Sequence, residues 1–327
     1  MIFLGYFILA LCMALLFTPV FKKVARRYGI FARPNHRTIH RGQVPKLGGG
    51  SIFVAFISGI LAMSWLQPEL LSGTPHAILS LVIGATILFF MGALDDKLDL
   101  NCNLKLFIEI GVALLAVLAG WRVETVLLPA SVQFSLGAFS WPLSVLWIVG
   151  IANSFNMIDG LDGLAGGIAL VVFGVSLVVA AMFGNLLIVV LSILMIGAVA
   201  GFLRYNINPA SIFMGDSGSL SLGFVLACLS LKSAMLQSGQ SAIVVPLLLL
   251  GLPITDTLLA VVRRLRRGIH PFHADKEHIH HRLVNLGLSQ SGAAMFMIGI
   301  TLMLGILAFL VAHGVYADFI WSHLVTF

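Results

Sequence analysis

The chain has 327 residues, of which 59% are hydrophobic and only 10% are charged, and its formal net charge is +6. Soluble domains average about 25% charged residues, so most of this chain cannot face water and its solvent must be lipid. The three cysteines are scattered and fit neither a disulfide framework nor a metal-binding spacing: Cys12, Cys102 and Cys228.

Apolar runs long enough to cross a bilayer follow one another along the chain, because about 20 residues of helix span the hydrocarbon core. The first run has no basic segment before it and no cleavage site, so we expect a retained helix rather than a signal peptide. The predicted fold is an all-α, polytopic integral membrane protein with one membrane-embedded domain, 1–327. About ten transmembrane helices are expected, near residues 2–20, 48–66, 77–94, 104–120, 141–156, 164–183, 186–203, 218–231, 241–262 and 292–312.

Charged residues indicate the orientation of these helices. Nearly all lysines and arginines fall in alternate loops, near 21–47, 95–104, 157–163, 204–217 and 263–291. The positive-inside rule therefore predicts a cytoplasmic face at these loops and both termini on the outside. Most acidic residues gather at the same face, although membrane insertion does not sort them; carboxylates at membrane depth are costly and usually functional. They are Asp95, Asp96, Asp99, Asp159, Asp162, Asp216, Asp256, Asp275 and Glu277.

The first two polar motifs in chain order are a basic loop and a carboxylate pair. The loop 33–50 ends in Pro45-Lys46-Leu-Gly-Gly-Gly, and its charge suits either anionic lipid or an anionic substrate. Asp95 and Asp96 end the third predicted helix. Adjacent carboxylates repel each other unless a cation relieves them. A divalent ion or Lys105 would do so; the alternative is a solvated helix end.

The next two motifs combine carboxylates with glycine. In a helix, Asn156, Asp159 and Asp162 would share one face, and Gly160 would allow a ligand close to the backbone. The segment Phe213-Met-Gly-Asp216-Ser-Gly-Ser precedes the eighth predicted helix. Small residues that open a helix expose N–H groups to an anion. Asp216 would suit a Mg²⁺ that bridges to phosphate oxygens. Ordinary polar turns or caps are the alternatives.

The last motif, from Arg263 to Arg282, joins arginines to His278-Ile-His280-His281. Arginines clamp phosphates bidentately, although they also serve as positive-inside charges. The histidines could bind zinc, but the neighbouring aspartates favour a harder ion. Together the motifs describe phosphate chemistry at the cytoplasmic surface of a membrane.

These motifs resemble the polyprenyl-phosphate N-acetylhexosamine-1-phosphate transferases, a family of the glycosyltransferase 4 type. The resemblance covers nearly the whole chain. It rests on Pro45-Lys-Leu-Gly-Gly, Gly92-Ala-Leu-Asp-Asp, Asn156-Met-Ile-Asp-Gly-Leu-Asp-Gly, Phe213-Met-Gly-Asp-Ser-Gly-Ser and His278-Ile-His-His. The segment from Pro271 to Arg282 looks more like the undecaprenyl-phosphate N-acetylglucosamine branch. The muramoyl-pentapeptide branch has three consecutive histidines.

The resemblance implies a role for each motif residue. Asp216 and Asp159 would bind Mg²⁺, with Mn²⁺ as a substitute. Asp95 and Asp96 would serve the lipid phosphate, with Asp95 the family's proposed base, and Lys105 would touch the diphosphate. The residues expected to contact the nucleotide sugar are Lys46, Asn156, Gly160, Asp162, Phe213, Arg263, Arg264, Arg266, His278, His280 and His281. The expected catalytic residues are Asp95, Asp96, Lys105, Asp159, His280 and His281.

The resemblance also implies the reaction. A sugar 1-phosphate, with N-acetylglucosamine (GlcNAc) favoured, would pass from a UDP-N-acetylhexosamine to undecaprenyl phosphate, and UMP would leave. This would be the first membrane step of a cell-surface polysaccharide such as O-antigen or teichoic acid, in the bacterial inner membrane. We expect membrane lipids but no nucleic acid as partners; the oligomeric state stays open, with a homodimer one alternative.

Two alternatives stay open. A secondary transporter for an anionic substrate would place its carboxylates near the midplane, often in inverted repeats. The muramoyl branch is the second alternative. A CDP-alcohol phosphotransferase is disfavoured because its long Asp-Gly-x-x-Ala-Arg motif is absent.

For the mechanism we expect a single displacement, with a double displacement through an aspartyl intermediate as the alternative.

Overall fold

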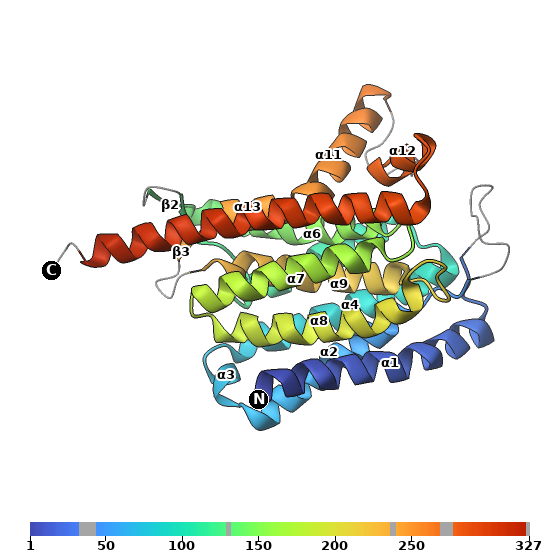
Figure 1. Ribbon diagram of the computed structural model, residues 1–327, viewed down its shortest axis with the longest axis horizontal. Helices are drawn as coiled ribbons and strands as arrows, with labels where there is room; N and C mark the ends of the chain where they lie inside the picture. The colour runs from blue at the N-terminus through green and yellow to red at the C-terminus, as the bar shows by residue number, and fades with distance from the viewer. Residues whose placement is uncertain (33–43, 129–131, 236–239, 269–276, 325–327) are drawn as a thin grey trace.

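The computed structural model describes residues 1–32, 44–128, 132–235, 240–268 and 277–324, and helices dominate these ranges. Figure 1 shows long helices lying side by side along one common direction. The long helices are α1 (Ile2–Tyr28), α2 (Gly49–Leu66), α4 (Pro75–Leu98), α5 (Cys102–Leu118), α6 (Ser140–Ile158), α7 (Leu164–Met182), α8 (Leu186–Asn206), α9 (Gly215–Ser233), α11 (Gly251–Arg266) and α13 (Gln290–Leu324). The short ones are α3 (Glu69–Ser72), η2 (Gly137–Phe139), α10 (Val244–Leu249) and α12 (Ile279–Asn285).

Seven helical segments in the described ranges are long and apolar enough to cross a membrane: Ile2–Tyr28, Gly49–Leu66, Pro75–Leu98, Gly137–Ile158, Leu164–Met182, Leu186–Asn206 and Gln290–Ala317. The protein is therefore an all-α polytopic membrane protein, as the sequence predicts. Helix α5, of 17 residues, and the more polar α9 lie in the same bundle. The number of ten crossings stays a prediction.

The ninth expected helix, 241–262, is not one helix. It is divided into α10 and α11 at Leu250, and Figure 1 shows α11 leaving the bundle. Pro253 gives the physical reason, because its ring clashes with the carbonyl of residue 249 and it has no N–H to donate. Beyond the break, α11 is amphipathic: Leu252, Asp256 and Ala260 are buried at intervals of four residues. The tenth helix extends beyond 312 to Leu324.

Helix α9 lies at the centre of the bundle and packs against α2, α4, α6, α7 and α8. Glycines allow its N-terminal end to approach two of these neighbours backbone to backbone. A Cβ on Gly49 of α2 would lie 2.0 Å from the Cα atom of Gly218. A Cβ on Gly92 of α4 would lie 2.4 Å from backbone atoms of Asp216. The first turn of α9 is thus enclosed by the motif-bearing ends of α2 and α4.

A small sheet marks one end of the bundle. Strands β1 (Thr125–Leu127), β2 (Gln133–Ser135) and β3 (Gln240–Ser241) form a sheet of order β2-β1-β3. The β1–β2 pair is antiparallel and the β1–β3 pair is parallel. Figure 1 shows the start of α1 and the end of α13 toward this end and α12 toward the opposite end. The first and last helices thus start and finish toward one end, which agrees with the prediction, while the assignment of that end to the outside stays a prediction.

Candidate active site

The segment before α2 pairs with the segment before α9, which brings two distant motifs together. The N–H of Phe213 donates to the carbonyl of Pro45 (2.9 Å). In return, the N–H groups of Gly48 and Gly49 donate to the carbonyls of Phe213 (2.8 Å) and Met214 (2.9 Å). This ladder places Lys46 at the N-terminal end of α9.

Lys46 joins two carboxylates there. Its Nζ lies 2.9 Å from Oδ1 of Asp96 and 3.3 Å from Oδ1 of Asp216. Burial alone would lower the pKa of Lys46, but the charges of Asp216 and Asp96 outweigh it and raise that pKa above its usual value. Lys46 is therefore a fixed positive charge at every physiological pH.

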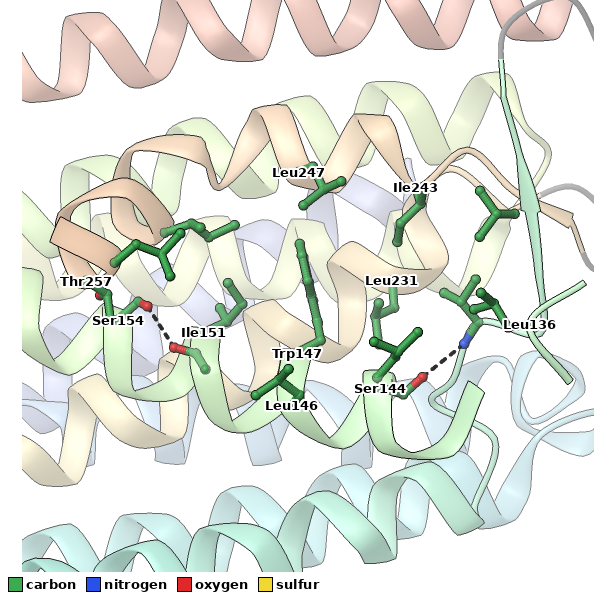
Figure 2. A pocket seen from close by; sticks show the side chains of 16 residues that line it. Leu136, Ser144, Leu146, Trp147, Ile151, Ser154, Leu231, Ile243, Leu247 and Thr257 are labelled. Carbon is green, nitrogen blue, oxygen red and sulfur yellow. Dashed lines mark hydrogen bonds between the residues drawn. The ribbon is translucent and has the colours of Figure 1, made fainter. Parts of the chain in front are cut away.

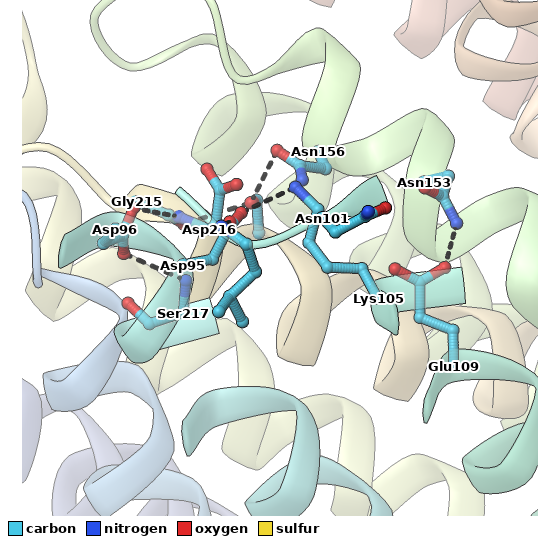
Figure 3. Close-up of polar contacts among 12 residues, drawn as sticks. Asp95, Asp96, Asn101, Lys105, Glu109, Asn153, Asn156, Gly215, Asp216 and Ser217 are labelled. Atoms are coloured by element: carbon cyan, nitrogen blue, oxygen red, sulfur yellow. Dashed lines mark hydrogen bonds and ion pairs between the residues drawn. The ribbon is translucent and has the colours of Figure 1, made fainter. Parts of the chain in front are cut away.

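Asp96 caps α9 from the end of α4. Its Oδ1 and Oδ2 accept from the backbone N–H groups of Asp216 (2.9 Å) and Ser217 (3.2 Å), as Figure 3 shows. Gly215 has a φ of +76°, and a Cβ at this position would lie 2.5 Å from Oδ2 of Asp96. Both carboxylate oxygens of Asp96 thus support the site, and its expected contact with a lipid phosphate stays a prediction.

Asp95, the neighbouring carboxylate, turns toward α5. Its Oδ2 lies 2.7 Å from Nζ of Lys105, and its Oδ1 accepts from the N–H of Leu100 (2.7 Å). The carboxyl groups of Asp95 and Asp216 also lie within hydrogen-bonding contact. Two carboxyl groups at that separation need a shared proton or nearby cations. The sequence prediction placed Lys105 beside the adjacent pair Asp95 and Asp96; in the structure Lys105 pairs with Asp95, whereas Asp96 pairs with Lys46.

The C-terminal end of α6 provides the third wall. Oδ1 of Asn156 accepts from the hydroxyl of Ser219 on α9 (3.3 Å). Asp159, at the end of α6, lies near enough to Lys46, Asp216 and Asp96 for their charges to affect its pKa. Burial is the main cause that raises the pKa of Asp159 to about 7, and the nearby carboxylates add to it. The positive charge of Lys46 acts in the opposite direction and favours the ionised carboxylate.

Asp162 has contacts within the protein. Its Oδ2 accepts from Nδ2 of Asn208 (3.0 Å) and from the N–H of Ala210 (2.9 Å), which holds the loop after α8 in place. Gly163, with a φ of +73°, donates its N–H to Oδ1 of Asn206 (3.1 Å). Phe213 is partly exposed at the start of α9. The expected nucleotide contacts of Asp162 and Phe213 stay predictions.

The histidine motif lies against the turn after α6. His280 is 1% exposed, and neither ring nitrogen has a hydrogen-bond partner within the described residues. A Cβ on Gly160 would lie 2.2 Å from its Nε2, so only glycine fits there. Burial first, and then His281 and His278, lower the pKa of His280 to about 3. Its imidazole is therefore neutral in this arrangement.

Arginines of α11 and α12 surround Glu277. The nearest distances from its carboxylate are 3.7 Å to Nε of Arg263, 2.8 Å to Nη1 of Arg267 and 3.3 Å to Nη2 of Arg282. Arg264 is buried and Arg266 is exposed. Several residues of the predicted loops lie outside the described residues: Arg33, His36, Arg37, His40, Arg41, Pro271, Asp275 and Lys276.

Sequence reasoning missed Glu109, and it counted Asp256 among the acidic residues of this face without giving it a role. Glu109 of α5 is 4% exposed, and Nδ2 of Asn153 on α6 donates to its Oε2. Figure 3 shows the pair beside Lys105. Asp256 of α11 is 1% exposed and binds His278. The signal for Glu109 was a lone acid within an apolar run, four residues after Lys105.

Asp159 and Asp216 suit a metal site of the kind in which the substrate supplies some of the ligands. Across the described ranges, no three His, Cys, Asp or Glu side chains are arranged to hold a metal ion. Proteins usually bind Mg²⁺ through one or two carboxylates together with substrate phosphates, so such a cage is not required. The raised pKa of Asp159 and its proximity to the charge of Asp216 fit a cation between them. The carboxylates of Asp159 and Asp216 are therefore suitable ligands for a divalent cation such as Mg²⁺.

An apolar cavity of about 430 Å³ opens between α6 and the α10–α11 pair. Figure 2 shows Leu231, Ile243 and Leu247 around Trp147, with Ser154 and Thr257 toward one end. Ser154 lies two residues before Asn156 on α6, so this end of the cavity is the one nearest the carboxylates.

The fold and site thus define a polytopic membrane protein that gathers carboxylates and lysines around one buried helix N-terminus. A family model described as glycosyl transferase family 4 matches residues 78–234. The chain is 39% identical over 296 residues to a "probable undecaprenyl-phosphate N-acetylglucosaminyl 1-phosphate transferase" of Bacillus subtilis (strain 168), covering 90% of this chain and 81% of that relative.

Two further relatives, both named undecaprenyl-phosphate alpha-N-acetylglucosaminyl 1-phosphate transferase, are each 30% identical to the chain. The protein of Escherichia coli (strain K12) aligns over 326 residues, covering 95% of this chain and 85% of the relative. The protein of Yersinia pestis aligns over 329 residues, covering 98% of this chain and 87% of that relative. The chain therefore belongs to glycosyl transferase family 4, which confirms the resemblance seen in the motifs.

Proposed function

We propose that the protein transfers GlcNAc 1-phosphate from UDP-GlcNAc to undecaprenyl phosphate and releases UMP. An oxygen of the lipid phosphate attacks the β-phosphorus, the bond from that phosphorus to the bridging oxygen breaks, and this oxygen leaves with UMP. The names of the relatives support the choice of substrates. The observation that carries the proposal is the cluster of Lys46, Asp216, Asp95 and Lys105 at the start of α9.

This cluster suits phosphoryl transfer because that chemistry depends on positioning and on charge neutralisation. Lys46 and Lys105 supply two cations, and each is held by an aspartate at 2.9 Å or less. Substrate phosphates would compete with these aspartates for the ammonium groups. Asn156, fixed by Ser219, would align the diphosphate from the α6 side.

We propose Mg²⁺ as the cofactor, with Mn²⁺ able to replace it. Asp216 and Asp159 would hold the ion together with oxygens of the diphosphate. The ion supplies neutralisation of the charge that develops on the leaving UMP. A cation beside Asp159 would also offset the effect of burial, which raises the pKa of this group.

Asp95 is better suited to hold Lys105 than to act as a base. A phosphate monoester has a second pKa of about 6, so the lipid phosphate is largely dianionic at pH 7 and needs little deprotonation. The 2.7 Å ion pair between Asp95 and Lys105 already engages one oxygen of this carboxylate, and the N–H of Leu100 engages the other.

The apolar cavity beside α6 is proposed to receive part of the polyprenyl chain. Its lining is almost entirely hydrophobic, and its end at Ser154 and Thr257 lies nearest the carboxylates. A lipid whose chain lies there would present its phosphate toward Asn156. We further propose that this end faces the cytoplasm of a bacterial inner membrane, since UDP-sugars are cytoplasmic metabolites and the last turns of α1, α8 and α11 carry Arg26, Arg204 and Arg263.

The test is UMP release by the purified protein with undecaprenyl phosphate, Mg²⁺ and a panel of nucleotide sugars. We expect release with UDP-GlcNAc, and little with UDP-glucose or with the UDP-muramoyl-pentapeptide. Preference for the muramoyl substrate would assign the protein to the other branch of the family. No UMP from any sugar would refute the proposal.

A further inference from the structure

A buried aspartate of α11 lies outside every motif of the reaction and binds the histidine segment at two points. Oδ2 of Asp256 lies 2.8 Å from Nδ1 of His278, and its Oδ1 accepts from the N–H of Ile279 at 2.8 Å. Asp256 is 1% exposed and His278 is 6% exposed. A carboxylate so deeply enclosed is costly unless its hydrogen bonds are satisfied, and these two bonds satisfy one oxygen each.

The contact determines which nitrogen of His278 carries the proton. An ionised carboxylate only accepts, so Nδ1 of His278 must donate to it. In the neutral ring the lone pair is then on Nε2. Nδ1 makes the one hydrogen bond of the His278 side chain within the described residues, so Nε2 is the nitrogen that remains for a ligand.

The same contact orients the rest of the segment. The rings of His278 and His280 are parallel, with an interplanar angle of 3° and centroids 5.7 Å apart. His280 in turn contacts Gly160, which follows Asp159 at the end of α6. A continuous chain of contacts thus runs from Asp256 through two imidazoles to the wall of the site.

We propose that Asp256 is a positioning residue for the transfer reaction: it fixes the tautomer and orientation of His278 so that Nε2 meets the nucleotide sugar. This inference rests on the proposed function. The break between α10 and α11 allows this contact, because an unbroken helix would continue along the bundle and would not bring Asp256 beside α12.

The discriminating variant is Asp256→Asn. The asparagine carbonyl can still accept from the N–H of Ile279, but its NH₂ group can only donate toward His278. Nδ1 must then become the acceptor, and the proton moves to Nε2. In a serine protease triad the same substitution lowers kcat about 10⁴-fold with the geometry intact. We expect a loss in kcat on the order of 10²- to 10⁴-fold here, with KM for undecaprenyl phosphate and the melting temperature close to wild type.

A double-mutant cycle separates positioning from a structural role. If Asp256 acts through His278, then Asp256→Asn causes little further loss in a His278→Gln background. A purely structural role, as the cap of α12 through Ile279, predicts losses that multiply. The control is Asn285→Ala, at an exposed position of the same short helix; it should retain wild-type kcat.

A second measurement does not depend on activity. In protein labelled with ¹⁵N-histidine, at pH 8.5 in detergent, the His278 signal is assigned by its absence in His278→Gln. We expect protonated Nδ1 and bare Nε2 in the wild type, and the reverse in Asp256→Asn. The same tautomer in both proteins, or multiplicative losses in the cycle, would overturn the inference. If the tautomers differ between the two proteins as expected but the wild type releases no UMP, the proposed function is overturned, and the role of Asp256 in that reaction is overturned with it.

Discussion

The contact between α4 and α9 offers a sharp test, because the two helices meet through glycine. In a Gly92→Ala variant, the new Cβ would lie 2.4 Å from the backbone carbon and oxygen of Asp216 and from the backbone nitrogen of Ser217. Ordinary contact begins near 3.4 Å, so the backbones must separate by about 1 Å. Helix backbones cannot turn away as side chains can.

Two effects of different size follow. Overpacking of this kind typically costs about 1–3 kcal/mol of stability. The displacement also moves Asp95 and Asp96, one turn further along α4, relative to Asp216. A misplacement of about 1 Å in an active site can reduce the rate on the order of 10²-fold. We therefore expect Gly92→Ala to lose far more activity than its stability change alone would cause.

The assays are UMP release and thermal unfolding in the same detergent. Gly111→Ala is the matched control: this glycine lies on neighbouring α5, and a Cβ there has nothing within 4 Å. We expect the control to keep full activity and to melt at or slightly above the wild-type temperature, since alanine favours the helix by up to about 1 kcal/mol. Wild-type activity and melting in Gly92→Ala would refute the close approach and the site built on it.

Three further outcomes are expected. Asp95→Asn should lose activity equally across pH 6–9 because Lys105 loses its partner; recovery at high pH in the pH–rate profile would support a base instead. Glu109→Gln should keep a free energy of unfolding within about 1 kcal/mol of wild type, because Asn153 keeps a hydrogen-bond acceptor. Glu109→Leu should lose about 1–3 kcal/mol of this free energy, because the amide of Asn153 is left unpaired. Equal stability of the two variants in thermal unfolding would contradict the contact. Chelation with EDTA should abolish UMP release, and added Mg²⁺ or Mn²⁺ should restore it; activity in EDTA would exclude the metal.

Most of the helices could be predicted from the sequence because lipid imposes a simple rule. Every backbone polar group in the bilayer must be satisfied within its own segment, so each apolar run of about 20 residues becomes a helix. The rule failed at 241–262, a mostly apolar run that Pro253 breaks into α10 and α11. Hydropathy does not register a missing N–H group.

The chemistry of the site could be predicted in part. Carboxylates at helix ends, among them Asp95 and Asp216, stand out because membrane insertion gives no reason for them. Glu109 was passed over, and Asp256 was counted with the acidic face but given no role, because a lone acid carries no spacing signal. Their importance follows from partners on other helices, Asn153 and His278, which a single sequence cannot assign.

The sequence by itself determined the solvent, the class of fold and the kind of chemistry, since these follow from composition and from residue types along one segment. The tertiary structure decided which charges meet. Lys46 joins Asp96 and Asp216 only because the segment before α2 pairs with the segment before α9. Ion pairs of this kind depend on separations of 3 Å between atoms that are distant along the chain, and only the packing of helices sets such separations.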